Sequence, residues 1–309
     1  MTGQPFDTPV LYLIFNRPAH TARSFAAIRE RRPTRLFIAA DGPRAHVQTD
    51  AARVAQCRAI ASAVDWPCEV QTLYRDENLG CRFAVSGGIS WFFDHVDKGI
   101  ILEDDCVPGP DFWPFCATLL ERYADDPRVM CISGNNFLPT WPTTREMYYF
   151  SRYPHIWGWA TWARAWVEYK FVPFTPTREQ VRTTLSNVGM LNPLSRWWWS
   201  RTMARYLHPE SSAWDYRWMY AMWMRQGLSI TPLRNLVRNI GVGSEGTHTT
   251  TRMYVPGAKT LDLQRSVNSV PPVLRNKLAD AVYDVAIITG RNLILHGTQK
   301  VASYVWRSR

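Results

Sequence analysis

Residues 98–108, KGIILEDDCVP, carry an apolar run directly into three consecutive carboxylates, Glu103, Asp104 and Asp105. The apolar part is typical of a buried strand. Three like charges at its end repel one another, so they need a cation or strong hydrogen-bond donors close by. The stretch therefore predicts a buried strand that ends in a charged site.

The same kind of apolar run alternates with amphipathic helical patterns through the first half of the chain. Predicted strands cover 9–15, 35–40, 69–74, 99–102 and 128–133, and predicted helices cover 21–30, 49–64, 82–95 and 111–124. This order predicts an α/β fold with a Rossmann-like, mainly parallel central sheet flanked by helices. Right-handed crossovers place the carboxyl ends of its strands at one edge.

Polar residues follow each of the first four predicted strands. They are Asn16 and Arg17, then Asp41 and Gly42, then Asn78 and Gly80, and finally Glu103, Asp104 and Asp105. Ligands of open α/β sheets bind beyond the carboxyl ends of the strands. We therefore expect these side chains to share one binding site.

The acidic cluster favours a hard divalent cation, Mn²⁺ or Mg²⁺. Such ions prefer oxygen ligands and are often held by one or two carboxylates together with substrate phosphates. The alternative is that one of the acids caps a helix. The segment 108–110, Pro-Gly-Pro, separates the cluster from the next predicted helix and disfavours that alternative.

The other strand-end residues each leave two interpretations open. Arg17 could hold a phosphate through its planar guanidinium or form a surface ion pair. Asp41 could hydrogen-bond a base or ribose, or belong to a plain turn. Asn78 and Gly80 at a helix start offer donors to a phosphate or ribose, but alone they are a weak signal.

From about residue 135 the sequence becomes rich in aromatic residues and broken by turns. The chain contains 15 Trp in 309 residues, and aromatic faces pack on sugars, stack on bases or fill cores. Trp197–Trp199 favour the core or an interface. The last segment, 261–309, is predicted to be a helical tail with basic residues near its end.

The net charge of +10 favours anionic partners, but the basic residues are scattered and no nucleic-acid-binding motif is present. We therefore expect no nucleic-acid partner. The six cysteines form no Cys-x-x-Cys pair and are expected to be reduced thiols. No run approaches the roughly 18 apolar residues of a membrane span, which predicts a cytoplasmic protein. The basic tail could contact the inner face of the plasma membrane peripherally, pack in a dimer or close the fold.

Residues 10–248 resemble the nucleotide-diphospho-sugar transferases of GT-A fold, in the branch that contains N-acetylglucosaminyltransferase I. The most specific matching segment is EDDCVPGPDFWPF at 103–115. The other segments are FNRP (15–18), AADG (39–42), WGWATWARAW (157–166), WDYRW (214–218) and GTHTT (246–250). The resemblance implies a donor-binding half at 1–134 and an acceptor-binding, catalytic half at 135–260.

The resemblance also implies roles for the residues after the strands. Arg17 would contact the diphosphate, and Asp41 would contact the uracil base. Asp105 would coordinate Mn²⁺, while Glu103 and Asp104 would contact the donor sugar and ribose. Asn78 and Gly80 complete the predicted donor site.

In the second half, Asp215 inherits the role of catalytic base, and Gly158 and Trp159 would line the sugar pocket. Trp157 and Trp159, on either side of Gly158, are the tryptophans expected to pack on a sugar, with core packing as the alternative for both. His248 would contact the diphosphate or the metal. Each has a structural alternative, namely a helix cap for Asp215, core packing for Trp159 and a plain loop for His248. The chain departs from the family where Tyr216 replaces a second acid. It also lacks a Golgi stem or membrane anchor, which suggests a bacterial cytoplasmic relative.

Together these features predict an inverting, metal-dependent glycosyltransferase. Its donor would be a nucleotide-diphospho-sugar, with UDP as the expected nucleotide and a hexosyl or N-acetylhexosaminyl group as the sugar. Its acceptor would be a hydroxyl of a glycan or lipid-linked glycan, as in polysaccharide biosynthesis. The alternative is a non-catalytic nucleotide- or glycan-binding protein of the same fold. The sequence does not address the oligomeric state.

Overall fold

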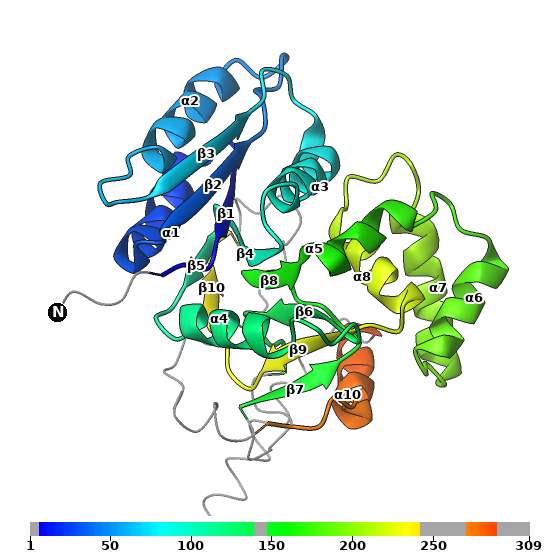
Figure 1. Ribbon diagram of the computed structural model, residues 1–309. Coiled ribbons are helices and arrows are strands. Elements are labelled where there is room, and N and C mark those ends of the chain that lie inside the picture. The colour runs from blue at the N-terminus through cyan, green and yellow to red at the C-terminus, as the bar shows by residue number, and fades with distance from the viewer. Residues whose placement is uncertain (1–5, 139–146, 242–269, 289–309) are drawn as a thin grey trace, which may run out of the picture.

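The computed structural model describes residues 6–138, 147–241 and 270–288 (Figure 1). Within these residues, eight strands form a central sheet in the order β3-β2-β1-β4-β8-β6-β9-β7. They are β1 (Val10–Ile14), β2 (Arg35–Ala40), β3 (Glu69–Tyr74), β4 (Lys98–Glu103), β6 (Val129–Ser133), β7 (Tyr148–Ser151), β8 (Trp159–Trp162) and β9 (Leu228–Pro232).

The predicted α/β fold with a mainly parallel sheet is confirmed. Strands β1 to β4 are parallel and are connected by α1 (Pro18–Arg31), α2 (Asp50–Ala61) and α3 (Gly80–Phe93). Strand β8 is antiparallel to both of its neighbours, β4 and β6, while β9 is parallel to β6 and antiparallel to β7. The sheet therefore continues from the 1–134 segment into the 135–260 segment without a break.

Helices cover both faces of this sheet, which explains its nearly continuous apolar strands. In β1, Val10, Tyr12 and Ile14 point into one core, and Leu11 and Leu13 point into the other. Helices α1, α2 and α4 (Phe112–Arg122) pack on the first face. The other face is covered by α3, α5 (Ala163–Trp166), α6 (Arg178–Asn187), α7 (Pro193–Tyr206) and α8 (Asp215–Met224).

A second, two-stranded sheet lies beside the end of β4. It pairs β5 (Cys106–Pro108) with β10 (Val237–Asn239) in antiparallel register. The sequence analysis predicts neither strand, because both are short and each pairs with a segment far away in the chain. The pairing rules out a helix cap for the acidic cluster, since Asp105 leads into a strand.

The described part of the predicted C-terminal helix is α10 (Lys277–Ile288), which packs against α7 and β7. Its Asp284 is buried and accepts hydrogen bonds from Arg152 (2.6 Å), from Trp199 Nε1 (3.1 Å) and from the Tyr153 hydroxyl. These bonds tie the helix to the sheet. Two parts of the predicted tail, 261–269 and 289–309, lie outside the described residues. No helix in the described part of the chain is long and apolar enough to span a membrane.

Replacing Asp284 with Ala should destabilise the protein strongly, because it leaves the buried Arg152 guanidinium without its main partner. Breaking a buried pair in this way costs about 3–5 kcal/mol. Urea unfolding measures the loss. As a control, Glu179→Ala breaks a pair with Arg182 in which both side chains are about two-thirds exposed, at 67% and 66%. That change should cost less than about 1 kcal/mol. Equal losses for the two variants would contradict the role of Asp284 as the stabilising partner of Arg152.

Candidate functional site

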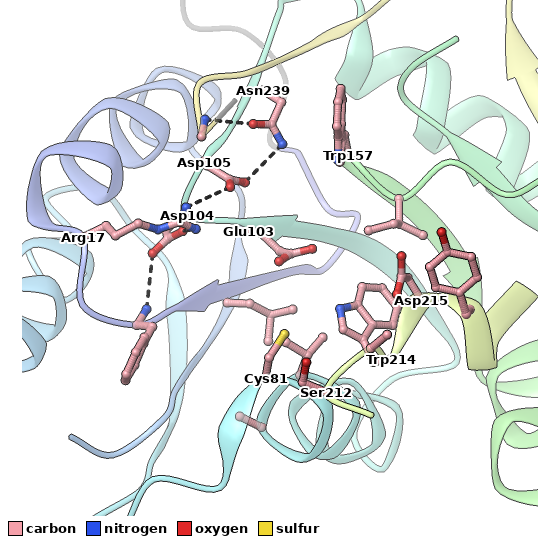
Figure 2. Close-up of a pocket in the computed structure, with 18 of the residues that line it drawn as sticks. Arg17, Cys81, Glu103, Asp104, Asp105, Trp157, Ser212, Trp214, Asp215 and Asn239 are labelled. Carbon is pink, nitrogen blue, oxygen red and sulfur yellow. Dashed lines mark hydrogen bonds and ion pairs between the residues drawn. The ribbon is translucent and has the colours of Figure 1, made fainter. Parts of the chain in front are cut away.

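A cavity of about 1400 Å³ opens at the carboxyl ends of the parallel strands. Figure 2 shows Arg17 and the three acids after β4 on one side of it, and Trp214 and Asp215 on the other. The predicted site residues in its wall are Arg17, Asp41, Asn78, Gly80, Glu103, Asp104, Asp105 and Asp215. Segments that are far apart in the sequence therefore meet at one edge of the sheet, as parallel topology requires.

Arg17 compensates two of the three carboxylates. In the parallel pairing of β1 with β4, Leu13 lies opposite Glu103, so the residues after both strands leave the sheet side by side. The Arg17 guanidinium donates to Asp104 and, through Nη1 at 3.1 Å, to Asp105. The guanidinium of Arg17 is therefore a cation that the protein itself supplies to this site.

Burial and mutual repulsion dominate the protonation of this cluster. Burial, followed by the charges of Asp105 and Asp104, raises the pKa of Glu103 well above its usual range. Burial also raises the pKa of Asp104, although Arg17 opposes this effect. Burial acts to lower the pKa of Arg17, but Asp104 and Asp105 outweigh it and raise that pKa, so the guanidinium remains charged.

The small β5–β10 sheet brings two further residues to Asp105 that the sequence analysis does not identify. Asn239 Nδ2 lies 3.5 Å from Asp105 Oδ1 and Asn239 Oδ1 accepts from the Gly241 backbone at 2.8 Å (Figure 2). A Cβ on Gly241 would lie only 2.3 Å from Asp105 Oδ2, so glycine is needed for this close approach. The glycine-rich run 241–246 is the sequence signal that could have indicated it.

Asp41 lies in the cavity wall, but its carboxylate is already engaged. One oxygen accepts from the backbone N–H groups of Gly42 (3.0 Å) and Leu79 (2.9 Å). The other accepts from Asn78 Nδ2 (2.9 Å) and the Gly80 backbone (3.0 Å). Four donors occupy the four lone-pair positions of a carboxylate. In this arrangement Asp41 holds the turn at the start of α3, where Gly80 has a φ of +77°.

Asp215 is the first residue of α8, following the N-cap residue Trp214. It is half-buried, and an acid in the first turn is favoured by the helix dipole. Its neighbour Tyr216 stacks on Tyr206 with ring centroids 4.1 Å apart and planes at 3°. Residues on α7 and α8 therefore form an aromatic wall beside this carboxylate.

The predicted sugar-pocket pair is placed differently from the expectation. Trp159 is fully buried in β8, stacked on Trp214 at 5.9 Å, and does not line the cavity. Gly158 is also absent from the wall, and it packs so closely on β10 that a Cβ there would lie 2.7 Å from the Val237 side chain. The preceding residue, Trp157, does line the cavity (Figure 2).

The Trp triplet divides among three environments along α7. Trp197 is 57% exposed, Trp198 lines the cavity and Trp199 is buried against α10. The preference for core or interface packing therefore describes Trp199 but not Trp198. His248, the remaining predicted site residue, lies outside the described residues.

His155 lies in the aromatic part of the cavity wall, between Phe137 and Tyr283. Its ring centroid lies 4.7 Å from that of Phe137 and 5.1 Å from that of Tyr283. Burial lowers the pKa of His155 to about 3. The imidazole is therefore neutral at physiological pH, and this end of the cavity is largely uncharged.

Metal ligands are sparse in the described residues. No group of three or more His, Cys, Asp and Glu side chains there could hold an ion by itself. The donor set at Asp105 consists of hard oxygen atoms at the cavity wall, which suits Mn²⁺ or Mg²⁺ only if a ligand supplies further oxygens.

Comparisons with known proteins add a distant likeness. No protein-family model matches the sequence, and no curated protein matches it. Among solved structures, the chain is similar to the apo form of mouse xyloside xylosyltransferase 1. The sequence identity is 11%, the coverage is 69% of this chain and 80% of that chain, and the TM-score is 0.35. A likeness this distant bears on neither activity nor substrate.

Asp41→Ala should lower stability by about 2–4 kcal/mol, because it leaves one buried and three partly buried N–H donors without their acceptor. Urea unfolding tests this. The matched control is Asp76→Ala in the same loop, where the side chain is exposed and the change should stay within about 0.5 kcal/mol. An Asp41→Ala protein with normal stability and weakened nucleotide binding would instead show that the residue serves a ligand alone.

His155 should make the protein sensitive to mild acid. Between its folded pKa of about 3 and the unfolded value near 6.5, the unfolded chain binds a proton that the native protein does not. The contribution of His155 to stability should therefore fall as the pH drops below about 6.5, by about 2 kcal/mol at pH 5. The raised pKa values of Glu103 and Asp104 act in the opposite direction, so the loss is measured as a difference between variants. Between pH 7 and pH 5, wild type and the exposed control His46→Gln should each lose about 2 kcal/mol relative to His155→Phe. Equal losses in all three proteins would contradict the role of His155.

Proposed function

We propose that this chain is an inverting, metal-dependent glycosyltransferase that moves a sugar from a nucleotide diphosphate to a hydroxyl acceptor. The observation that carries the proposal is the convergence of Arg17, Asp105 and Asp215 on one cavity at the carboxyl ends of parallel strands. Sheet edges of this kind are where α/β proteins bind nucleotides. The cavity exceeds the volume of a typical ligand pocket, so a donor and an acceptor can occupy it together.

The donor diphosphate would bind beside Arg17. This guanidinium is already aimed at the carboxyl edge of the sheet, and its planar fork suits phosphate oxygens as well as carboxylates. UDP-sugar is the proposed donor because the AADG segment resembles a uracil-reading segment. Asp41 would then act mainly by ordering Asn78 and Gly80 at the rim of the nucleotide site.

Asp105 would hold Mn²⁺ or Mg²⁺ together with oxygens of the donor diphosphate. Such shared sites are common for hard cations, and they agree with the lack of a three-residue cage in the described residues. When bound, the cation supplies positive charge that stabilises the departing nucleoside diphosphate. Asn239 and Gly241 keep the Asp105 carboxylate in place from the side of β10.

Asp215 is the proposed catalytic base. A carboxylate on the α8 side of the cavity can take the proton of an acceptor hydroxyl while that hydroxyl attacks the sugar from the face opposite the diphosphate. Attack from the opposite face inverts the anomeric carbon. The buried Trp214 beside Asp215 shields this region from water.

The acceptor is proposed to be a glycan or a lipid-linked glycan. Trp157, Trp198 and Tyr216 line the same cavity as Asp215 and offer aromatic faces on which sugar rings can pack. The neutral His155 adds no charge to this aromatic end of the cavity.

The test is to incubate the protein with a panel of UDP-sugars and Mn²⁺ and to measure turnover as the release of UDP. Asp215→Asn should lower turnover by about 10²- to 10⁴-fold, because it removes the general base. UDP binding by this variant should be unchanged. Asp105→Ala should lose metal-dependent UDP binding as well as turnover. Glu210→Gln, whose side chain is 91% exposed, is the control and should behave as wild type.

Two outcomes would contradict the proposal in different ways. Metal-dependent UDP binding without turnover of any sugar or acceptor would identify a non-catalytic nucleotide-binding protein. Full activity of Asp215→Asn would keep the transferase but remove Asp215 as its base.

A further inference from the structure

Two buried arginines lie together outside the cavity. Arg82 is the third residue of α3 and Arg217 is the third residue of α8. They are 8% and 6% exposed, and neither lines the cavity described above. Figure 1 shows their two helices on the same side of the sheet.

Both guanidiniums lie over the same aromatic ring. The Arg217 Cζ atom is 3.9 Å from the centroid of Phe174, and the Arg82 Cζ atom is 5.3 Å from it. Arg217 also lies 5.6 Å from the Tyr169 ring. The ring attracts each cation, but it offers no hydrogen-bond acceptor in the plane of either guanidinium.

No carboxylate in the described part of the chain forms an ion pair with either arginine. Arg82 Nη1 donates to the carbonyl of His208 at 3.3 Å, and Arg217 Nη2 donates to the carbonyl of Val172. Two buried guanidinium nitrogens of this cluster, Arg82 Nε and Arg217 Nη1, have no hydrogen-bond partner. The Tyr169 hydroxyl lies near the Ser86 side chain but forms no hydrogen bond of normal geometry.

This arrangement is incomplete as it stands. Buried charges in proteins are normally paired, because an uncompensated charge away from water is costly. Burial lowers the pKa of Arg217; Tyr169 opposes this effect and the positive charge of Arg82 adds to it, and the guanidinium remains protonated at neutral pH. Two guanidiniums that each carry an unpartnered N–H group, with the Tyr169 ring beside Arg217, form a set of donors that lacks an anionic acceptor.

We propose that the cluster of Arg82, Arg217 and Tyr169 is a binding site for an oxyanion such as a phosphoryl group. The two unpartnered guanidinium nitrogens and the Tyr169 hydroxyl would donate to its oxygens. Guanidinium groups match the geometry of phosphate oxygens and bind them with charge-assisted hydrogen bonds. Phe83 and Phe174, which are 52% and 49% exposed, lie over the arginines, so the site is one side chain below the surface.

An oxyanion there would connect two elements that flank the cavity. Arg82 follows Cys81 in α3, and Arg217 lies two residues after Asp215 in α8. Both Cys81 and Asp215 line the cavity (Figure 2). The bound anion would therefore hold α3 and the start of α8 together. This inference is independent of the proposed function, since it applies whether or not the chain transfers sugars.

Titration calorimetry of the full-length protein with inorganic phosphate tests the site, at constant ionic strength maintained with chloride. Wild type should bind one phosphate saturably outside the cavity and gain thermal stability from it. Arg82→Gln and Arg217→Gln should each weaken binding by about tenfold or more, because each removes a charged donor. Tyr169→Phe keeps the ring and should weaken binding by about threefold. The control is Arg225→Gln, an arginine just after α8 that is 57% exposed and paired with Glu168, and it should bind as wild type.

Several results would overturn the site. One is the absence of saturable phosphate binding, and another is binding that Arg217→Gln and Tyr169→Phe both leave unchanged. Binding lost in Arg17→Gln but kept in Arg217→Gln would place the phosphate in the cavity. If the arginine variants do not fold, phosphate binding by Tyr169→Phe alone decides whether the site exists.

A second titration with glycerol phosphate distinguishes the source of the anion. Tighter binding of inorganic phosphate would support an enclosed site for the free ion. Tighter binding of the ester would support a site for the phosphoryl group of a larger ligand. If neither compound binds, no phosphoryl site exists there.

Discussion

The site depends on the charge compensation between Arg17 and the carboxylates that follow β4. Parallel pairing of β1 with β4 brings the two strand ends together, and the guanidinium then engages Asp104 and Asp105. Without this cation, burial would favour the neutral forms of Glu103 and Asp104 still further. The pairing also holds positive and negative groups at the same edge of the sheet, so an incoming diphosphate and its counter-ion would meet groups that are already oriented. The chemistry proposed for the cavity is therefore a consequence of how the first four strands are ordered.

Other buried carboxylates follow the same rule, and they organise the surroundings of the cavity. Asp41 accepts four hydrogen bonds and so orders the turn that begins α3. Asp284 accepts from Arg152, Tyr153 and Trp199 and so fixes α10 at the aromatic end. In each case a single acidic residue replaces water for several donors from distant segments. Arg82 and Arg217 beneath Phe174 differ, because both are buried and no carboxylate among the described residues pairs with either of them.

The surplus of tryptophan is divided between packing and the cavity wall. Trp159 packs against Trp214 and Trp218 beneath the start of α8, where it stabilises the position of Asp215. Trp157, two residues earlier, faces the cavity. Residues two apart in a continuous strand would share one face, but Gly158 between them has a φ of +64°, so the chain turns there and the two side chains take different roles. The aromatic composition thus supports the rigid wall of the site as much as any contact with a ligand.

The sequence by itself determined the order of strands and helices from β1 to β4, with α4 and β6 after them, because periodicity and turn residues are local properties. It also determined that Arg17 and Asp105 would share an edge, since parallel topology gathers strand ends whatever the side chains are. It did not predict β5 or the strands after residue 135. Only the tertiary structure decided that Trp159 is buried, that Asn239 supports Asp105 and that Arg217 lies beside Arg82. These facts depend on contacts between residues that are remote along the chain. No local pattern specifies such contacts, because the free energy that selects them comes from the packing of the whole fold.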